Sequence, residues 1–214
     1  MMKRRLWLCF FSIWMIQTGF SQNSISPVSV EKSTVQESHW TEIFKPIPAT
    51  EITDNVFKAF GTDWACITAM KDSMPNSMTA SFGGWGILFG KPVVWCFLRA
   101  NRYTLELIRE SKMFTVSYFD TQYKDQLLLF GSKSGRNSNK MKETRLTFIN
   151  TPDGNVSYQE ARLILECKLI NITTVHPEDF YTEEGKQFVL NGYRDVQDYH
   201  KFVFGEITHV WIRK

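Results

Sequence analysis

The chain has 214 residues, of which 43% are hydrophobic and 14% aromatic, so it buries the core of one or two domains and disorder is excluded as its main state. Its 25 basic residues nearly balance its 22 acidic residues, which excludes the strongly basic surface of a nucleic-acid-binding protein. Residues 1–21 contain three of the basic residues and no acidic one, so the remainder is formally neutral.

Residues 1–21 have the layout of a secretory signal peptide. A basic start precedes an apolar run at residues 6–16, which is shorter than the roughly 20 residues needed to cross a bilayer. The small residues Gly19 and Ser21 then precede Gln22, as they do before a cleavage site. We expect an exported protein, periplasmic or secreted, with no stable membrane span after cleavage. An uncleaved anchor or an amphipathic helix is the alternative, and the route of export stays open.

The segment at residues 22–43 is polar and rich in serine, which predicts an arm or linker before the main domain at residues 44–214. A short helix is expected at residues 56–60, capped by Thr53 or Asp54 and ended by Gly61. Strands are then expected at residues 64–70, 77–82, 93–98 and 114–119.

Two helices, at residues 104–111 and 123–131, are predicted to interrupt these strands, and long strands follow at residues 162–174 and 201–213. The apolar phase of the last strand shifts by one residue at Gly205, which predicts a β-bulge there. Many antiparallel strands with a few short helices predict a mainly β protein, a closed or partly closed barrel.

Three cysteines remain after the leader, which contains Cys9. Cys66, Cys96 and Cys167 each lie in an apolar, strand-like run, where a free cysteine usually behaves as a small buried hydrophobe. The sequence has no Cys-x-x-Cys pair and no Cys/His spacing that suits zinc. We therefore expect neither a disulfide nor a metal site.

The first candidate site is the strand-like run at residues 76–84, Asn-Ser-Met-Thr-Ala-Ser-Phe-Gly-Gly. Its small, hydroxylated side chains let a flat ligand approach the backbone closely and leave backbone hydrogen-bonding groups available. The alternative is an ordinary strand-to-loop junction that uses glycine for its turn.

The second candidate site joins the most apolar strand to the helix at residues 104–111. Arg99 and Arg102 flank a helix start at which Thr104 is a possible cap. Free N–H groups at a helix start and guanidinium forks both suit a phosphate. The alternative is a pair of solvated arginines, paired with Glu106 and Glu110.

A third candidate is the polar loop at residues 131–140, which carries Lys133, Arg136 and Lys140 and can fold over an anion or stay a surface loop. His200 precedes the last strand, where its side chain can reach a barrel mouth or serve a structural role. The sequence contains no Walker-type loop and no G-x-G-x-x-G motif, which argues against a Rossmann nucleotide site.

Six segments, in this order, resemble the flavin reductase-like, FMN-binding split-barrel family and its flavoredoxin-like branch. They are residues 63–64, 76–81, 99–104, 131–136 with Lys140, 165–168, and 198–200 followed by 205–207. The chain departs from the family at Arg145, where a glycine usually precedes the Leu-Thr pair. The leader is the larger departure, because most relatives are cytosolic.

The resemblance implies an FMN-binding split β-barrel and a homodimer with FMN at or near its interface. It also implies NAD(P)H or a redox partner protein as electron donor. His200 is the one candidate for a catalytic helper, on the nicotinamide side. The residues it implies for FMN binding are Asn76, Met78, Thr79, Ala80, Ser81, Arg99, Arg102, Tyr103, Thr104, Ser134, Arg136 and Lys140.

The resemblance leads to one main functional hypothesis and two alternatives. The main one is an FMN-dependent oxidoreductase that passes electrons from NAD(P)H through bound flavin to a second acceptor. The first alternative is a non-enzymatic electron carrier with tightly bound FMN, which export favours because nicotinamide nucleotides are scarce outside the cytoplasm. The second is a split barrel that has lost flavin and binds another flat ligand.

Overall fold

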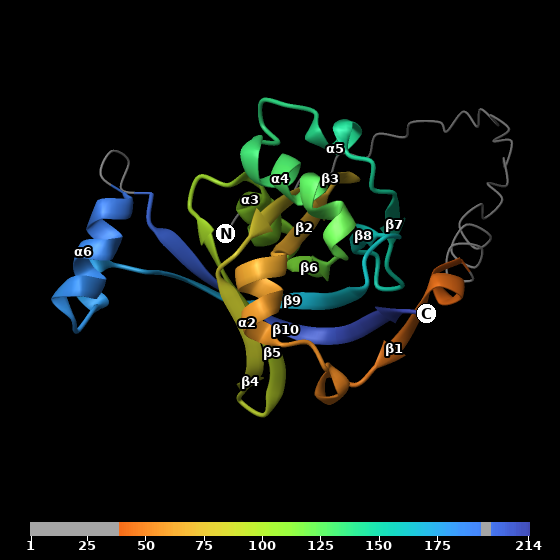
Figure 1. Ribbon diagram of the computed structural model, residues 1–214, viewed down its shortest axis with the longest axis horizontal. Coiled ribbons are helices and arrows are strands. Elements are labelled where there is room, and N and C mark those ends of the chain that lie inside the picture. The colour runs from red at the N-terminus through yellow and green to blue at the C-terminus, as the bar shows by residue number, and fades with distance from the viewer. Residues whose placement is uncertain (1–38, 194–197) are drawn as a thin grey trace, which may run out of the picture.

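A computed structural model describes residues 39–193 and 198–214. In these residues one eight-stranded sheet forms the body of the molecule, and a two-stranded hairpin and several short helices lie around it (Figure 1). No described helix has both the length and the apolar character needed to cross a membrane. The expected signal peptide and most of the expected arm lie outside the described residues.

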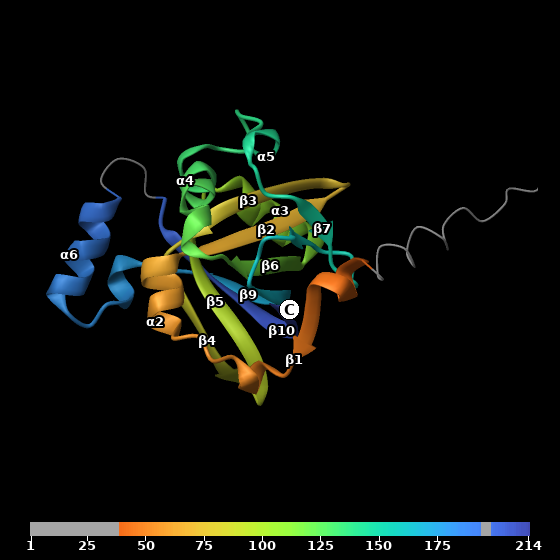
Figure 2. The ribbon, with the colours of Figure 1, turned by 45° about the vertical axis from the view of Figure 1, so that its right-hand side comes forward.

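The large sheet is antiparallel throughout, in the order β3-β2-β6-β9-β10-β5-β4, and β1 also pairs with β10. Its strands are β1 (Phe44–Ile47), β2 (Ala65–Lys71), β3 (Met74–Ala80), β4 (Gly83–Leu88), β5 (Lys91–Arg99), β6 (Met113–Tyr118), β9 (Leu163–Thr174) and β10 (His200–Arg213). The hairpin consists of β7 (Phe148–Asn150) and β8 (Val156–Tyr158). The strands wrap around a common interior (Figure 2).

The long strand β10 joins most of the sheet together. It pairs with β9 on one side, and on the other side with β5 through residues 200–206 and with β1 through residues 210–213. The register shifts between Phe204 and Gly205, which confirms the predicted bulge. A Cβ atom at Gly205 would lie 2.5 Å from the Phe114 ring, so the packing of this ring against the β10 backbone requires glycine.

Two apolar clusters stabilise the described part of the chain. The first fills the interior of the sheet and includes Ile67, Leu98, Val116 and Leu165, all fully buried. The second packs the β7–β8 hairpin and helix α4 (Lys124–Ser132) against the outside of the sheet. Cys66, Cys96 and Cys167 are buried free thiols, in the environment predicted for them.

The helix expected at residues 56–60 differs from the prediction at both ends. Helix α2 (Val56–Lys58) is capped by Asn55, whose side chain accepts the N–H of Lys58 at 3.1 Å, so the expected caps Thr53 and Asp54 were wrong. Asp54 instead forms an ion pair with Arg162. The helix also continues through Gly61 as the π-helical turn η2 (Ala59–Asp63), since one glycine weakens a helix without ending it.

Helices α3 (Tyr103–Ser111) and α4 confirm the two predicted helices. Helix α6 (Glu183–Gly192) was not expected, and it projects from the barrel beyond the ends of β9 and β10 (Figures 1 and 2). The short helix α5 (Lys140–Glu143) and the 3-10 turns η1 (Ala49–Glu51), η3 (Thr121–Tyr123) and η4 (Pro177–Asp179) are smaller elements, and the described residues 39–43, just before β1, are also helical.

Candidate functional site

A cavity of about 290 Å³ opens between strand β3, the start of helix α3 and the loop at residues 131–137. We call it the Asn76 pocket. Nine of the twelve residues expected to bind a cofactor line it: Asn76, Met78, Thr79, Arg102, Tyr103, Thr104, Ser134, Arg136 and Lys140. The three segments that the sequence singled out separately thus form one site.

Asn76 lies at the back of this pocket and is 2% exposed. Its Nδ2 donates to the Thr104 hydroxyl at 2.7 Å, and its Oδ1 has no hydrogen-bond partner among the described residues. A buried carbonyl oxygen without a donor is costly, so this atom calls for a donor from a ligand. Because the Thr104 oxygen accepts from Asn76, the Thr104 hydroxyl hydrogen is available to a ligand oxygen.

The start of helix α3 borders the same pocket. The structure places Arg102 at the N-cap and Thr104 second in the helix, so the expectation that Thr104 caps this helix was wrong. Arg102 is half-buried, and no described carboxylate pairs with it. The first N–H groups of a helix lack internal partners and carry partial positive charge. Together they form a site for an anion.

The loop at residues 131–137 is tied to helix α3 by Arg136. Its guanidinium pairs with Glu106, donates to the Asn101 carbonyl at 2.6 Å and lies 5.4 Å from the centre of the Tyr103 ring. A Cβ atom at Gly135 would lie 2.0 Å from Asn76 Oδ1, so only glycine fits there. Arg136 therefore positions the loop, and its charge is already balanced.

Lys140 closes the base of the loop and is 2% exposed. Its Nζ donates to the carbonyls of Phe130 and Lys133, at 3.0 and 2.9 Å. Burial lowers its pKa to about 8, an effect that Cys66 opposes and Arg102 reinforces. Lys140 thus lines the pocket, while its ammonium group donates hydrogen bonds to backbone carbonyls at the two ends of the loop's first turn.

Two other expected residues, Ala80 and Ser81, lie just beyond the pocket. Ala80 is buried and pairs with Ala65 across β2 and β3, and Ser81 follows at the end of β3. Thr79 remains in the pocket, where its hydroxyl donates to the Leu127 carbonyl. Its oxygen is left as a possible acceptor for a ligand.

Arg99 and His200 are directly paired across β5 and β10, and both line a second cavity, which excludes Arg102. The structure thus separates the two arginines that the sequence placed together. Burial, followed by the charges of Arg99 and Arg102, lowers the pKa of His200 to about 4. The imidazole is therefore neutral near pH 7.

Several lining residues of the Asn76 pocket were not predicted: Asn101, Phe130, Gly131, Lys133, Gly135 and Asn137. All but Phe130 fall inside the candidate segments at residues 99–104 and 131–140. Their place in these segments was the one sign in the sequence that they could line the site. Phe130 falls in the helix predicted at residues 123–131, and its ring is buried.

The comparisons with known proteins agree with this architecture. The model of the "Flavin reductase like domain" family matches residues 57–214. No curated protein sequence matches significantly.

Solved structures with the same fold include three bacterial proteins. An FMN-binding protein from Thermus thermophilus with bound 1-cyclohex-2-enone is 18% identical, with 78% of this chain and 76% of that chain covered and a TM-score of 0.55. An FMN-binding domain of a flavin reductase-like enzyme from Shewanella baltica OS155 is 15% identical (79% and 76% covered, TM-score 0.57). Flavoredoxin of Desulfovibrio vulgaris (Miyazaki F) is 22% identical (78% and 76% covered, TM-score 0.54).

These neighbours confirm the predicted fold, a mainly β split barrel with short helices. The family model spans the strands and helices that build the Asn76 pocket. The chain belongs to the flavin reductase-like domain family.

Proposed function

We propose that this protein binds FMN in the Asn76 pocket and acts as an FMN-dependent oxidoreductase, with NAD(P)H as electron donor. The observation that carries the proposal is the buried Oδ1 of Asn76, which lies beside Arg102 and the start of helix α3. Within the part of the chain that the structure describes, neither this oxygen nor the Arg102 guanidinium has a partner. The FMN-binding neighbours support the choice of flavin.

The residues present fit the parts of FMN that lie outside its ring. A phosphate suits Arg102, the Thr104 hydroxyl and the first N–H groups of α3. A ribityl hydroxyl suits Asn76 Oδ1, because that oxygen needs a donor and a phosphate has none to give. Beside these groups, Met78 adds an apolar surface and Thr79 a hydroxyl group.

Bound FMN would supply the redox chemistry, taking a hydride from NAD(P)H and passing electrons to a second acceptor. The protein's own part is to bind and orient. Lys140 holds the loop over the pocket through two backbone carbonyls, and Arg136 ties that loop to Glu106 of α3. His200, neutral near pH 7, can position a substrate by hydrogen bonding and does not serve as a strong acid there.

A second candidate function is a flavoredoxin-like electron carrier without substrate turnover. The likeness to flavoredoxins from Desulfovibrio vulgaris and Methanosarcina acetivorans favours it, as does the expected export. In either function we propose a homodimer, with FMN at or near the interface, in the periplasm or outside the cell.

The decisive experiment is the visible absorbance spectrum of the purified protein, followed by FMN titration. A flavin spectrum or saturable one-to-one binding supports the cofactor, and the absence of both overturns the proposal. Steady-state oxidation of NADH and NADPH, with free FMN or FAD as acceptor, then separates the two candidates. Turnover supports the oxidoreductase, whereas a yellow protein that only a protein partner reduces supports the carrier.

A further inference from the structure

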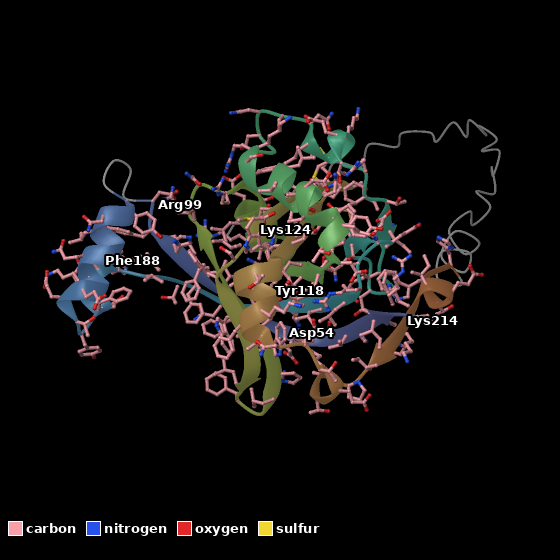
Figure 3. The ribbon with its side chains drawn as sticks, in the orientation of Figure 1. Asp54, Arg99, Tyr118, Lys124, Phe188 and Lys214 are labelled. Carbon is pink, nitrogen blue, oxygen red and sulfur yellow. The ribbon has the colours of Figure 1, made fainter. Side chains whose placement is uncertain are left out.

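Three side chains with metal-binding atoms meet on the outer face of the sheet, at the turn of the β7–β8 hairpin. Asp153 from that turn, Glu166 from β9 and His209 from β10 bring one ligand atom each within 4.8 Å of one another. We call them the Asp153 cluster. Figure 3 shows Arg99 and Lys214 on opposite sides of the molecule, and His209 lies toward the Lys214 end of β10.

A β-bulge in β10 aligns His209 with Glu166. Ile207 pairs with Cys167, and the next paired residues are His209 and Glu166, so Thr208 is left out of the ladder. In a regular strand, Thr208 would lie opposite Glu166 and the histidine would point to the other face. The bulge therefore turns the imidazole toward the carboxylate, as bulges do where they redirect a side chain.

The hairpin turn holds Asp153 beside the same histidine. Gly154 has a φ of +82°, a conformation that glycine adopts without strain. Its N–H donates to the Thr151 carbonyl at 2.9 Å, and the Asn155 N–H donates to the Thr151 hydroxyl at 2.9 Å. Asp153 Oδ2 then lies 2.9 Å from His209 Nδ1. A fixed turn thus supplies the third ligand atom.

Glu166 is a fully buried carboxylate that neutral donors orient. Its Oε1 accepts from the Thr151 hydroxyl and, at 2.7 Å, from Asn155 Nδ2. Its Oε2 accepts from Trp211 Nε1 at 3.3 Å and lies 3.9 Å from His209 Nδ1. Outer partners of this kind fix the orientation of carboxylates that bind metals.

The cluster contains two carboxylates and no permanent cation. Among the described residues, no Lys or Arg pairs with Asp153 or Glu166, and His209 carries a charge only when it is protonated. Glu166 is 0% exposed, and a buried carboxylate without a counter-charge is costly. A divalent cation would balance both carboxylates at once.

We propose that Asp153, Glu166 and His209 bind a divalent transition-metal ion such as Zn²⁺. Zinc binds nitrogen and carboxylate oxygen at about 2.0–2.2 Å in a tetrahedron, which separates neighbouring ligand atoms by about 3.3 Å. The two distances from His209 Nδ1, 2.9 and 3.9 Å, lie on either side of this value. The imidazole nitrogen disfavours Ca²⁺ and Mg²⁺, which prefer oxygen ligands. Asp153 and His209 are 42% and 44% exposed, so water can supply the fourth ligand.

The bound ion would join the hairpin turn to β9 and β10. The sequence predicted no metal site, because the three ligands come from segments far apart in the chain. The cluster shares no residue with the Asn76 pocket, so the proposal goes beyond FMN binding and does not depend on it.

Calorimetric titration of ZnCl₂ into the EDTA-treated full chain, purified without a histidine tag, tests the proposal. We expect one-to-one binding of Zn²⁺ and no binding of Mg²⁺ at the same concentration. Asp153→Asn and His209→Gln, both at half-exposed positions, should each weaken Zn²⁺ by about tenfold or more, since loss of an outer partner alone has an effect of this size. His39→Gln is the matched control, because it removes an exposed histidine outside the cluster, and it should bind Zn²⁺ as wild type does.

Thermal unfolding with and without Zn²⁺ checks the fold of each variant and the place of the ion. Zn²⁺ should raise the Tm of wild type and His39→Gln, because a ligand that binds the folded chain stabilises it, and should raise it less in Asp153→Asn and His209→Gln. The Tm without metal reports whether each variant folds. The proposal is overturned if wild type does not bind Zn²⁺, if it binds Mg²⁺ equally well, or if Asp153→Asn and His209→Gln bind Zn²⁺ as tightly as His39→Gln does.

Discussion

Removal of the Arg102 guanidinium tests the phosphate site most directly. The side chain is half-buried at the start of α3 and has no described carboxylate partner, so Arg102→Ala removes a charge without leaving a carboxylate unpaired. A charge-assisted hydrogen bond contributes about 1.5–3 kcal/mol. FMN should therefore bind roughly tenfold to a hundredfold more weakly.

The assay is titration of flavin fluorescence with FMN and with riboflavin, which lacks the phosphate. Riboflavin should bind wild type more weakly than FMN does and be nearly indifferent to Arg102→Ala. Arg99→Ala is the matched control, because that arginine lines the other pocket, and it should leave FMN affinity unchanged. Equal losses for the two flavins, or a loss of FMN affinity with Arg99→Ala alone, would refute the reasoning.

Four further predictions follow from the same structure and sequence. The pKa of Lys140 falls from 10.5 to about 8 on folding, so between these pH values the unfolded chain binds more protons than the folded chain. The free energy of unfolding should therefore rise with pH in this range in wild type relative to Lys140→Met. Urea denaturation of both proteins at several pH values measures this difference, and the same pH dependence in both would contradict the prediction. Gly135→Ala places Cβ against Asn76 Oδ1, and overpacking of about 1–3 kcal/mol should weaken FMN binding by roughly fivefold to a hundredfold. Gly131→Ala, whose Cβ meets Thr79 at an ordinary 3.5 Å, should bind FMN normally, and equal binding by both variants would count against the geometry. Sedimentation of the FMN-bound protein at micromolar concentration should show a dimer, and a monomer alone would exclude the proposed interface. N-terminal sequencing of exported protein should begin at or within a few residues of Gln22, and a start at Met1 would overturn the leader.

Local sequence patterns predicted the elements that have a clear period or a clear end. The alternating residues of β9 and β10 and the bulge at Gly205 followed from the pleat of a strand. Strand β4 was not predicted, because three of the six residues in Gly-Gly-Trp-Gly-Ile-Leu are glycines, which have a low β propensity. The start of helix α6 could have been predicted from the sequence, because Thr182, a residue type that caps helices, precedes two acidic residues. In the structure the Thr182 hydroxyl accepts the Gly185 N–H.

The candidate site was predictable as a set of segments and not as a set of contacts. Arg99 and Arg102 are three residues apart, and nothing local tells which of them faces a distant partner. The Gly192 carbonyl that binds Arg99 comes from a helix more than ninety residues later. Likewise, the burial of Lys140 depends on the carbonyls of Phe130 and Lys133, which only the folded loop brings together.

The central position of β10 in the sheet has a consequence for folding. Its residues pair with β9, β5 and β1, so the hydrogen bonds of three strands that precede it are complete only when β10 is in place. Its partners in β5 and β1 lie about a hundred residues or more earlier in the chain, and contacts so distant in sequence form late. Removal of β10 should therefore give a chain that stays unfolded and is degraded or aggregates.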